Sequence, residues 1–314
     1  MRAVWAAVKA GMTKAGLGAF LLSAFALSFT SGCVPEPPPA SPASATAIDF
    51  TKPAAARAML AELAGYADSQ TALMVEVTKH SVALSVLKDM QPRTYTYRDG
   101  KIEEVQTDMA YVDQATFDTS DFNLDNVGAL FRAAGAISGS EQNQRLQVVD
   151  YSSGRVMMSV STNPESKTVF FNQDGSLLKL LNFDTLGGIK EGIAEVCGTL
   201  NEAYEVGITS DQMAYVDFPG SDEGTVVRRQ RTQRVPVTTI TRSENTSAEP
   251  FSPKRIHPEV IWQVVDSHLG VKDTPADAQW QVRVVRGTSQ EPVMRFTIGS
   301  NEILTDLAGK MVTG

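Results

Sequence analysis

Four segments of the chain carry apolar residues at the three- and four-residue spacing that is typical of an amphipathic helix. In residues 122–137, for example, Val127, Leu130, Phe131 and Ala134 fall on one side of such a helix. The same reasoning predicts helices over residues 54–66, 122–137, 188–204 and 256–271.

Between these segments the pattern changes to short apolar runs and to the two-residue alternation of β-strands. Tyr95 and Tyr97 alternate with threonines, which is typical of a sheet with one face in water, and we interpret both tyrosines as exposed aromatics. An Asp-Gly pair at 99–100 indicates a hairpin turn. Strands are predicted over residues 72–77, 82–87, 94–105, 146–151, 155–161, 167–171, 212–218, 225–231, 235–240, 280–285, 293–298 and 302–307.

The pattern repeats along the chain at a fixed offset, which places Phe122 on Ile256. Apolar positions of 122–137 coincide with those of 256–271, and the agreement returns further on, where Gly175 falls on Gly309. A similar order of helix and strands precedes each of these units. We therefore predict an α+β fold of two tandem duplicated domains, 48–183 and 184–314, each built from α-β-β-β units with helices packed on antiparallel β-sheet.

Residues 167–180, KTVFFNQDGSLLKL, consist of a predicted strand, an Asp-Gly turn and a second extended run. Exported α-β-β-β modules of this kind resemble the PepSY-type repeat. Tandem pairs of helix-plus-sheet units also resemble the secreted β-lactamase-inhibitory proteins. These resemblances cover topology and a few turn residues, bring no catalytic residue, and imply binding or inhibition.

The N-terminal residues bear on where the protein is located in the cell. Three basic residues, the last of them Lys14, precede an apolar run over 15–29, and the small residues Ser31 and Gly32 stand directly before Cys33. The run is shorter than the roughly 20 residues of a membrane span. The segment resembles the signal peptide and lipobox of a bacterial lipoprotein precursor, although Thr30 occupies a position that is usually Leu.

This resemblance implies that residues 1–32 are a signal peptide and that Cys33 is the lipidation site. It implies a covalent diacylglycerol and an N-linked acyl chain such as palmitate, with no other cofactor. We expect an exported protein anchored in the cell membrane or the outer membrane. An ordinary signal peptide cut near Gly32 and an uncleaved anchor remain alternatives.

The net charge of the chain limits the kinds of partner that the protein is expected to bind. Removal of residues 1–32 takes away three positive charges and no negative ones, so the formal charge changes from −8 to −11. We therefore predict that the protein does not bind nucleic acid, whose phosphates need a basic surface. Residues 33–47 are rich in Pro, Ala and Ser and are expected to form a tether beyond the lipidated cysteine.

One segment concentrates positive charge, RRQRTQR at 228–234. On a strand, its side chains alternate between the two faces of the sheet. The segment is a candidate site for an anion or a protein partner, and the alternative is a charged edge strand that discourages aggregation. The candidate binding residues are Arg228, Arg229, Arg231 and Arg234.

Other reactive residue types have simpler interpretations. Cys197 shares one side of a predicted helix with Ile193, which favours a small buried apolar role over a nucleophile. The three histidines, His80, His257 and His268, have no neighbours at metal-ligand or triad spacing. An acidic run at 118–125 lacks the spacing of a calcium loop and suits a helix N-terminus. No catalytic residue and no metal site is predicted.

The sequence thus favours a lipid-anchored cell-envelope protein, a non-enzymatic binding, scaffold or inhibitor-like module that acts through protein–protein contacts. A carrier of a lipid or another hydrophobic ligand is the alternative, with Met157 and Met158 as candidate lining residues. An envelope hydrolase is the third possibility. The expected partners are the membrane and an envelope protein.

Overall fold

The computed structural model describes residues 48–106, 109–111, 113–162, 167–244, 246, 248–271, 274–287 and 290–312. The predicted signal peptide, Cys33 and the tether lie outside the described residues.

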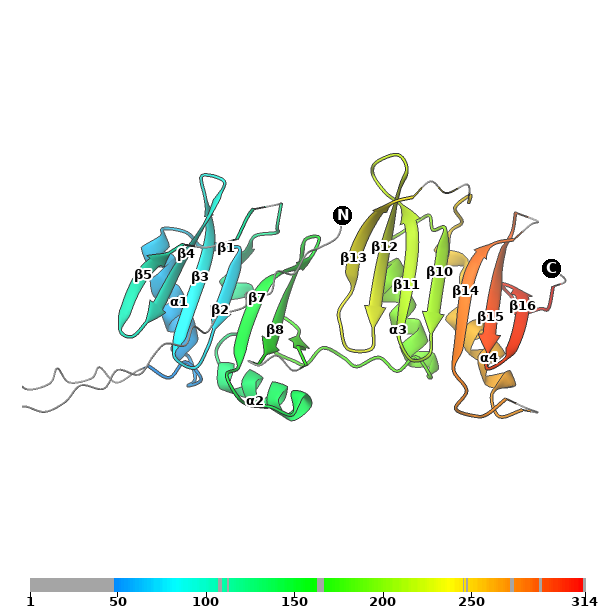
Figure 1. Cartoon of the computed structure of the whole chain (residues 1–314), viewed down its shortest axis with the longest axis horizontal. Coiled ribbons are helices and arrows are strands. Elements are labelled where there is room, and N and C mark those ends of the chain that lie inside the picture. The colour runs from blue at the N-terminus through cyan, green and yellow to red at the C-terminus, as the bar shows by residue number, and fades with distance from the viewer. Residues whose placement is uncertain are drawn as a thin grey trace, which may run out of the picture. The chain divides into compact units, whose positions relative to one another are not determined.

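The first half of the described chain is one antiparallel sheet of seven strands, with both helices on the same face (Figure 1). The strand order is β5-β4-β3-β2-β7-β8-β9. Its elements are α1 (Ala55–Ala67), β2 (Met74–Val77), β3 (Ser81–Lys88), β4 (Gln91–Arg98), β5 (Lys101–Val105), α2 (Val127–Ser138), β7 (Arg145–Ser152), β8 (Arg155–Ser161) and β9 (Val169–Phe171).

The second half repeats this arrangement in the order β13-β12-β11-β10-β14-β15-β16. The fold is therefore α+β, with two similar halves, as the sequence predicts. The elements are α3 (Leu186–Cys197), β10 (Glu205–Thr209), β11 (Met213–Pro219), β12 (Thr225–Thr232), β13 (Thr238–Ser243), α4 (Pro258–His268), β14 (Trp280–Arg286), β15 (Pro292–Ile298) and β16 (Asn301–Asp306).

Local chemistry fixes where the helices begin. Asn126 caps α2 by accepting a hydrogen bond from the Ala129 amide at 3.0 Å, and Thr185 caps α3 by accepting one from Gly188 at 3.1 Å. Helix α4 begins instead with Pro258, whose missing N–H is not needed in the first turn. Each helix then buries its apolar side against alternate residues of the strands.

The connections between elements repeat as closely as the strands. The 3₁₀ turns η1 (Thr119–Asp121) and η2 (Pro253–Arg255) coincide when one half is shifted onto the other by the offset found in the sequence. The same offset separates the bridge between Phe171 and Leu177 from the bridge between Thr305 and Met311. A short two-stranded ladder of the first half, β1 (Thr71–Ala72) with β6 (Phe117–Asp118), corresponds to a single bridge between Ala203 and Phe251 in the second. The duplication thus extends to turns and crossovers.

Three details differ from the sequence prediction. The first helix-and-strand unit of each half has four main-sheet strands instead of the three of an α-β-β-β unit; in the first half the predicted turn at 99–100 divides residues 94–105 between β4 and β5. The prediction missed β10 and ran the preceding helix to residue 204, whereas α3 ends at Cys197 and Gly198 follows with a φ of 49°. Tyr95 and Tyr97 point into the helix-side core, where they make edge contacts with Tyr66 and Phe50 respectively, so the prediction that they are exposed was wrong.

Candidate binding surface on the second sheet

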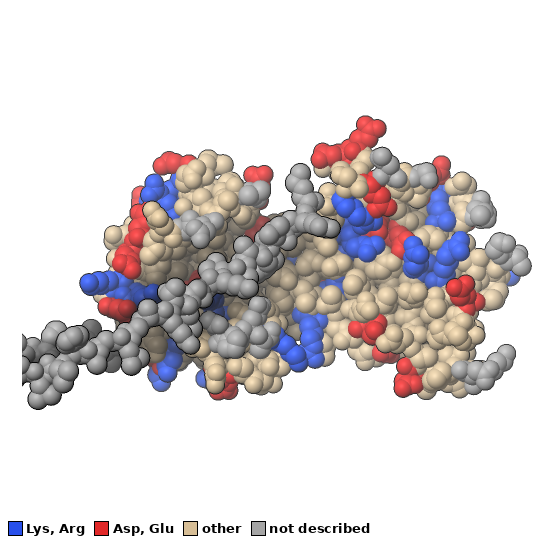
Figure 2. Space-filling view, viewed as in Figure 1, with Lys and Arg blue, Asp and Glu red and all other residues tan. Residues whose placement is uncertain are grey.

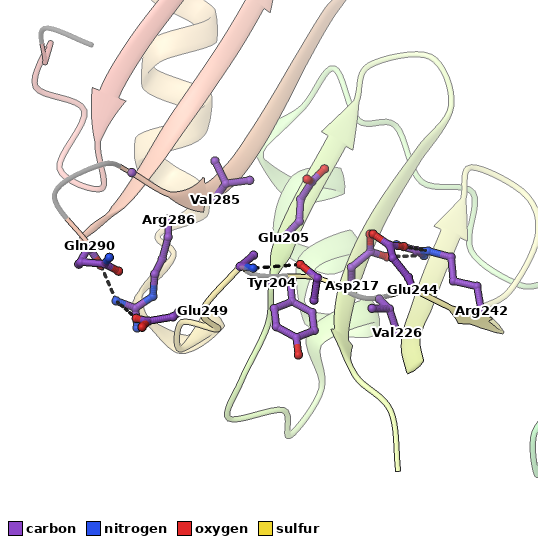
Figure 3. A pocket seen from close by; sticks show the side chains of 13 residues that line it. Tyr204, Glu205, Asp217, Val226, Arg242, Glu244, Glu249, Val285, Arg286 and Gln290 are labelled. Atoms are coloured by element: carbon purple, nitrogen blue, oxygen red, sulfur yellow. Dashed lines mark hydrogen bonds and ion pairs between the residues drawn. The ribbon is translucent and has the colours of Figure 1, made fainter. Parts of the chain in front are cut away.

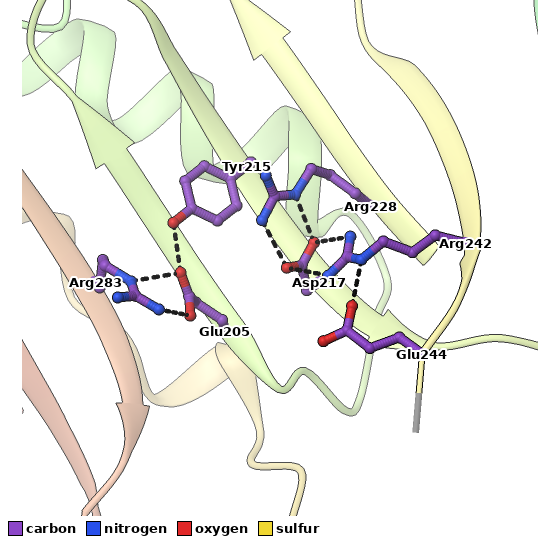
Figure 4. Close-up of polar contacts among 7 residues, drawn as sticks. All are labelled: Glu205, Tyr215, Asp217, Arg228, Arg242, Glu244 and Arg283. Carbon is purple, nitrogen blue, oxygen red and sulfur yellow. Dashed lines mark hydrogen bonds and ion pairs between the residues drawn. The ribbon is translucent and has the colours of Figure 1, made fainter. Parts of the chain in front are cut away.

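The sheet face away from the helices carries a network of charged side chains in the second half. Asp217 on β11 is its centre, with a side chain that is only 8% exposed. Arg228 on β12 donates to both carboxylate oxygens of Asp217, at 2.7 Å each, and Arg242 on β13 donates to the same carboxylate at 2.9 Å (Figure 4). Arg242 also pairs with Glu244. One carboxylate therefore joins three adjacent strands.

A second ion pair lies beside the first. Arg283 on β14 donates to both oxygens of Glu205 on β10, at 2.8 and 2.6 Å, and the Tyr215 hydroxyl donates to the same carboxylate (Figure 4). The guanidinium carbon of Arg228 lies 4.2 Å from the centre of the Tyr215 ring. This cation–π contact connects the two ion pairs into one network.

Burial and pairing act together on the pKa values of this network. Burial alone would raise the pKa of Asp217, but hydrogen bonds from Arg228 and Arg242 outweigh it and hold the pKa below its usual value. The pKa of Glu205 is lowered in the same way, against the effect of burial, by Arg283 and Tyr215.

The donors of the network shift in the opposite direction. Burial and the hydrogen bond to Glu205 raise the pKa of Tyr215. The hydrogen bond to Asp217 raises the pKa of Arg228 and of Arg242, and the bond to Glu205 raises that of Arg283. At neutral pH the network consequently holds fixed ionised carboxylates and fixed protonated donors.

Next to the network the surface forms a hollow of about 390 Å³ (Figure 3). Arg286 on β14 donates to the Pro250 carbonyl at 3.0 and 2.7 Å and so holds the segment that follows β13 against the sheet. Four acidic and two basic side chains line the hollow, and Figure 2 shows the two charges intermingled over these strands. The lining residues include Tyr204, Glu205, Asp217, Arg242, Glu249 and Arg286.

The four predicted binding arginines separate in the structure. Arg228 joins the network, and Arg234 is exposed in the turn after β12. Arg229 lies on the helix side of the sheet, its guanidinium 5.1 Å from the Phe218 ring. The alternation expected of a strand is therefore present, but it divides the segment between two faces and leaves no continuous strip.

Arg231 requires a correction, because the prediction of an accessible binding residue conflicts with its complete burial. It donates to Glu195 on α3 at 2.9 Å and to the carbonyls of Thr232, Val235 and Lys179. Its charge holds β12 to α3 and to the segment that follows β9.

The acidic partners and the arginines from other strands were not predicted from the sequence. In the ion pairs of Asp217 with Arg228, of Asp217 with Arg242 and of Glu205 with Arg283, the partners lie 11, 25 and 78 residues apart in the sequence. Alternation was a partial signal, since Tyr215 and Asp217 alternate with apolar residues in β11, whereas β12 is polar at five consecutive positions, 228–232. Strand register alone decides which of them meet.

Cys197 is a buried free thiol, as the sequence favours. Burial raises its pKa to about 12, despite the opposing charge of Arg229. The thiol is therefore protonated at neutral pH and packs as an apolar group in the core of the second half.

The other candidate groups make local contacts. His268 Nδ1 lies 2.8 Å from the Val264 carbonyl, and His257 occupies the position before α4 without capping it by a side-chain hydrogen bond. In the acidic run, Asp118 accepts a hydrogen bond from the Ser120 amide and Asp125 pairs with Arg57 at 3.0 Å. The described residues contain no cluster of three or more His, Cys, Asp or Glu suited to a metal ion.

Comparisons with known proteins add little. No family model and no curated protein matches the chain. Among solved structures, it is similar to the Helicobacter pylori β clamp (11% identity, 82% of this chain and 63% of that one, TM-score 0.13) and the Thermotoga maritima DNA polymerase III β subunit (11%, 83% and 64%, TM-score 0.15). The chain spans less than two thirds of the length of either structure, and TM-scores this low carry no argument about fold or function.

Proposed function

We propose that the chain is a lipid-anchored cell-envelope protein that acts without catalysis and binds a protein partner through the outer face of its second sheet. The lipobox-like residues before Cys33 support the lipid anchor and the location at the cell envelope. Within the described residues, no helix has the length and apolar character needed to cross a membrane.

One observation carries the binding role: the charged groups of the outer face are paired in advance and hold fixed charge. A general acid or base works best with a pKa near the working pH. The pKa values of Asp217 and Glu205 are lowered and that of Tyr215 is raised, so these groups are shifted away from proton transfer at neutral pH. Such a rigid pattern of both charges suits recognition of a complementary protein surface.

The test measures both the membrane anchoring of the protein and its binding of partners. Mass spectrometry of protein from the membrane fraction should find acylated Cys33 at the mature N-terminus, and a Cys33→Ala variant should move to the soluble fraction. Partners captured from envelope extract are then compared for the wild type and Glu249→Lys, which reverses a 67% exposed charge beside the hollow. We expect capture to fall at least tenfold.

A matched control is Glu62→Lys, the same charge change at an exposed position of α1. It should leave capture unchanged. If all three proteins capture the same partners, the outer face of the second sheet is not the binding surface. If the wild type is unmodified and soluble, the protein is not lipid-anchored.

The carrier function remains a second candidate because of one apolar hollow. Its volume of about 350 Å³ lies at the lower end of known ligand pockets, and it is lined by Phe170, Leu177 and Leu180 among others. Met157 and Met158, proposed from sequence as lining residues, are buried and do not line this hollow. Native mass spectrometry of the purified protein decides this candidate: a bound lipid supports a carrier, and a bare chain counts against it.

A further inference from the structure

The first half contains a second, larger hollow of about 640 Å³, and its charge is unlike that of the protein as a whole. Lys79, Arg132 and Arg145 line it together with His80, and Glu141 is the one acidic lining residue. The hollow therefore concentrates positive charge on a chain whose mature form has a formal charge of −11.

Much of this positive charge has no counterion within the protein. Lys79 and Arg132 are exposed, and within the described ranges neither has a carboxylate oxygen within 4.0 Å. Arg145 lies 3.6 Å from Glu76 and keeps 48% of its side chain exposed. The charge of Lys79 does help to lower the pKa of nearby Asp49, behind the hydrogen bonds from Thr51. An anion that enters the hollow thus meets two exposed cations without an ion pair among the described residues, Lys79 and Arg132, and a third, Arg145, that is half exposed.

The hollow also lies where the predicted tether joins the folded part. His80 Nδ1 is 3.3 Å from the carbonyl oxygen of Ile48, the first described residue. Between Cys33 and Ile48 the sequence is Pro-rich, and fifteen residues of any chain reach at most about 54 Å. An anchored protein therefore holds this hollow close to the membrane surface, where a short tether gives a high effective concentration.

The duplication provides an internal comparison. The three-residue turn Thr78–His80 corresponds to Ser210–Gln212, so Asp211 takes the position of Lys79. At the offset that places Gly175 on Gly309, Asp266 takes the position of Arg132 and Gln279 that of Arg145. The equivalents also meet, because Gln279 donates to Asp211 at 3.0 Å. Only the copy that joins the tether is basic at this place, which the shared fold does not require.

We propose that this basic hollow binds the phosphate headgroups of anionic phospholipids in the membrane that carries the anchor. The inference rests on the lipid anchor of the proposed function. Lys79, Arg132 and Arg145 supply the charge, and the tether supplies proximity. The contact orients the first half toward the membrane and leaves the network of the second half available to a partner.

The test uses the mature chain, residues 33–314, with Cys33→Ala, so that acylation does not contribute to binding. Co-sedimentation is measured with vesicles of phosphatidylcholine alone and with equal parts of phosphatidylcholine and phosphatidylglycerol. We expect clear preference for the anionic vesicles, weakening with added salt. Each basic residue near an anionic surface contributes about fivefold, so Lys79→Glu with Arg132→Glu should reduce binding at least ~25-fold.

The matched control reverses two other exposed charges that have no ion pair among the described residues, Lys101→Glu with Arg295→Glu. It makes the same change in net charge and should retain most of the binding. Both double variants alter exposed positions, and thermal unfolding verifies that they are folded.

Three results would overturn the inference. They are equal binding to both kinds of vesicle, equal loss in the two double variants, and displacement by inorganic phosphate at the concentration of lipid phosphate, which would make the hollow a site for the free ion. The anchor is judged separately, by mass spectrometry of Cys33 in the wild type, so failure of one proposal is distinguishable from failure of the other.

Discussion

The two halves place different chemistry at equivalent backbone positions. On the outer face, Ser85 is the register partner of Thr94 in the first half, and the two hydroxyls form a buried hydrogen bond of 2.8 Å. Asp217 and Arg228 are partners at the same place in the second half and form an ion pair. The strand pairing accommodates a small neutral pair or a large charged pair without a change of register.

The helix side differs in the same manner. Tyr95 and Tyr97 of β4 correspond to Arg229 and Arg231 of β12, as their partners on the neighbouring strands show. The first half fills the space with aromatic rings, whereas the second inserts two cations. The duplicated fold therefore depends on the pattern of strand pairing and burial more than on the type of group that is buried. The comparison also indicates which substitutions should destabilise only one of the two halves.

The largest effect is expected for Arg231→Ala. The substitution leaves Glu195 and three backbone carbonyls without their donor and opens a cavity, so the free energy of unfolding should fall by about 3–5 kcal/mol. Urea unfolding monitored by circular dichroism measures the change.

Glu195→Gln is the control for the ion pair, because it keeps a hydrogen-bond acceptor at that position and Glu195 is 24% exposed. It should cost less than Arg231→Ala. A loss below about 1 kcal/mol for Arg231→Ala, the size of an ordinary surface change, would show that the second half does not depend on this buried cation.

The helix side also shows the limits of reading the sequence. Alternation predicted that Arg229 and Arg231 share a face and that Arg228 lies on the other, and the structure agrees. It could not predict which face is covered, because that depends on where α3 packs. Arginine and tyrosine are usually predicted to lie on the solvent-exposed face of a sheet. Here the first half buries Tyr95 beside the ring of Tyr66, and the second half buries Arg231 beside the carboxylate of Glu195.

The fold itself was more accessible than the site. The helical spacing, the Asp-Gly turns and the fixed offset between the repeats are local or repeated signals, and they predicted two similar α+β halves. Asp217 with Arg242, and Glu205 with Arg283, are brought together by strand order and register, which no local pattern reveals.

An intermediate effect is expected at the outer-face pair. Asp217→Asn removes the charge that Arg228 and Arg242 share, and it should lower the free energy of unfolding by about 2 kcal/mol at neutral pH. Ser85→Ala breaks the equivalent neutral hydrogen bond and should cost about 1 kcal/mol. Equal costs would contradict the distinction between the two halves.

The stability contributions of the charged pair and of the neutral pair should also differ in their dependence on pH. Because the pKa of Asp217 is lower in the folded state than in the unfolded chain, its contribution is complete above about pH 4 and is lost as the pH falls through the folded-state value. The difference in unfolding free energy between wild type and Asp217→Asn should therefore shrink in acid. The difference between wild type and Ser85→Ala should stay constant, since neither hydroxyl titrates.

The smallest effect compares the two copies of one turn. Gly175 and Gly309 follow β9 and β16 with φ values of 85° and 80°, a region that costs a residue with a Cβ about 1 kcal/mol. A Cβ at Gly175 would meet its nearest atom at 3.5 Å, whereas one at Gly309 would lie 3.0 Å from Val260 Cγ1. Gly175→Ala should therefore cost only the backbone strain, and Gly309→Ala should cost more because Val260 on α4 must shift. Urea unfolding of the two variants measures both costs, and equal losses would show that backbone strain, rather than the approach of the helix, decides how each copy tolerates a side chain in this turn.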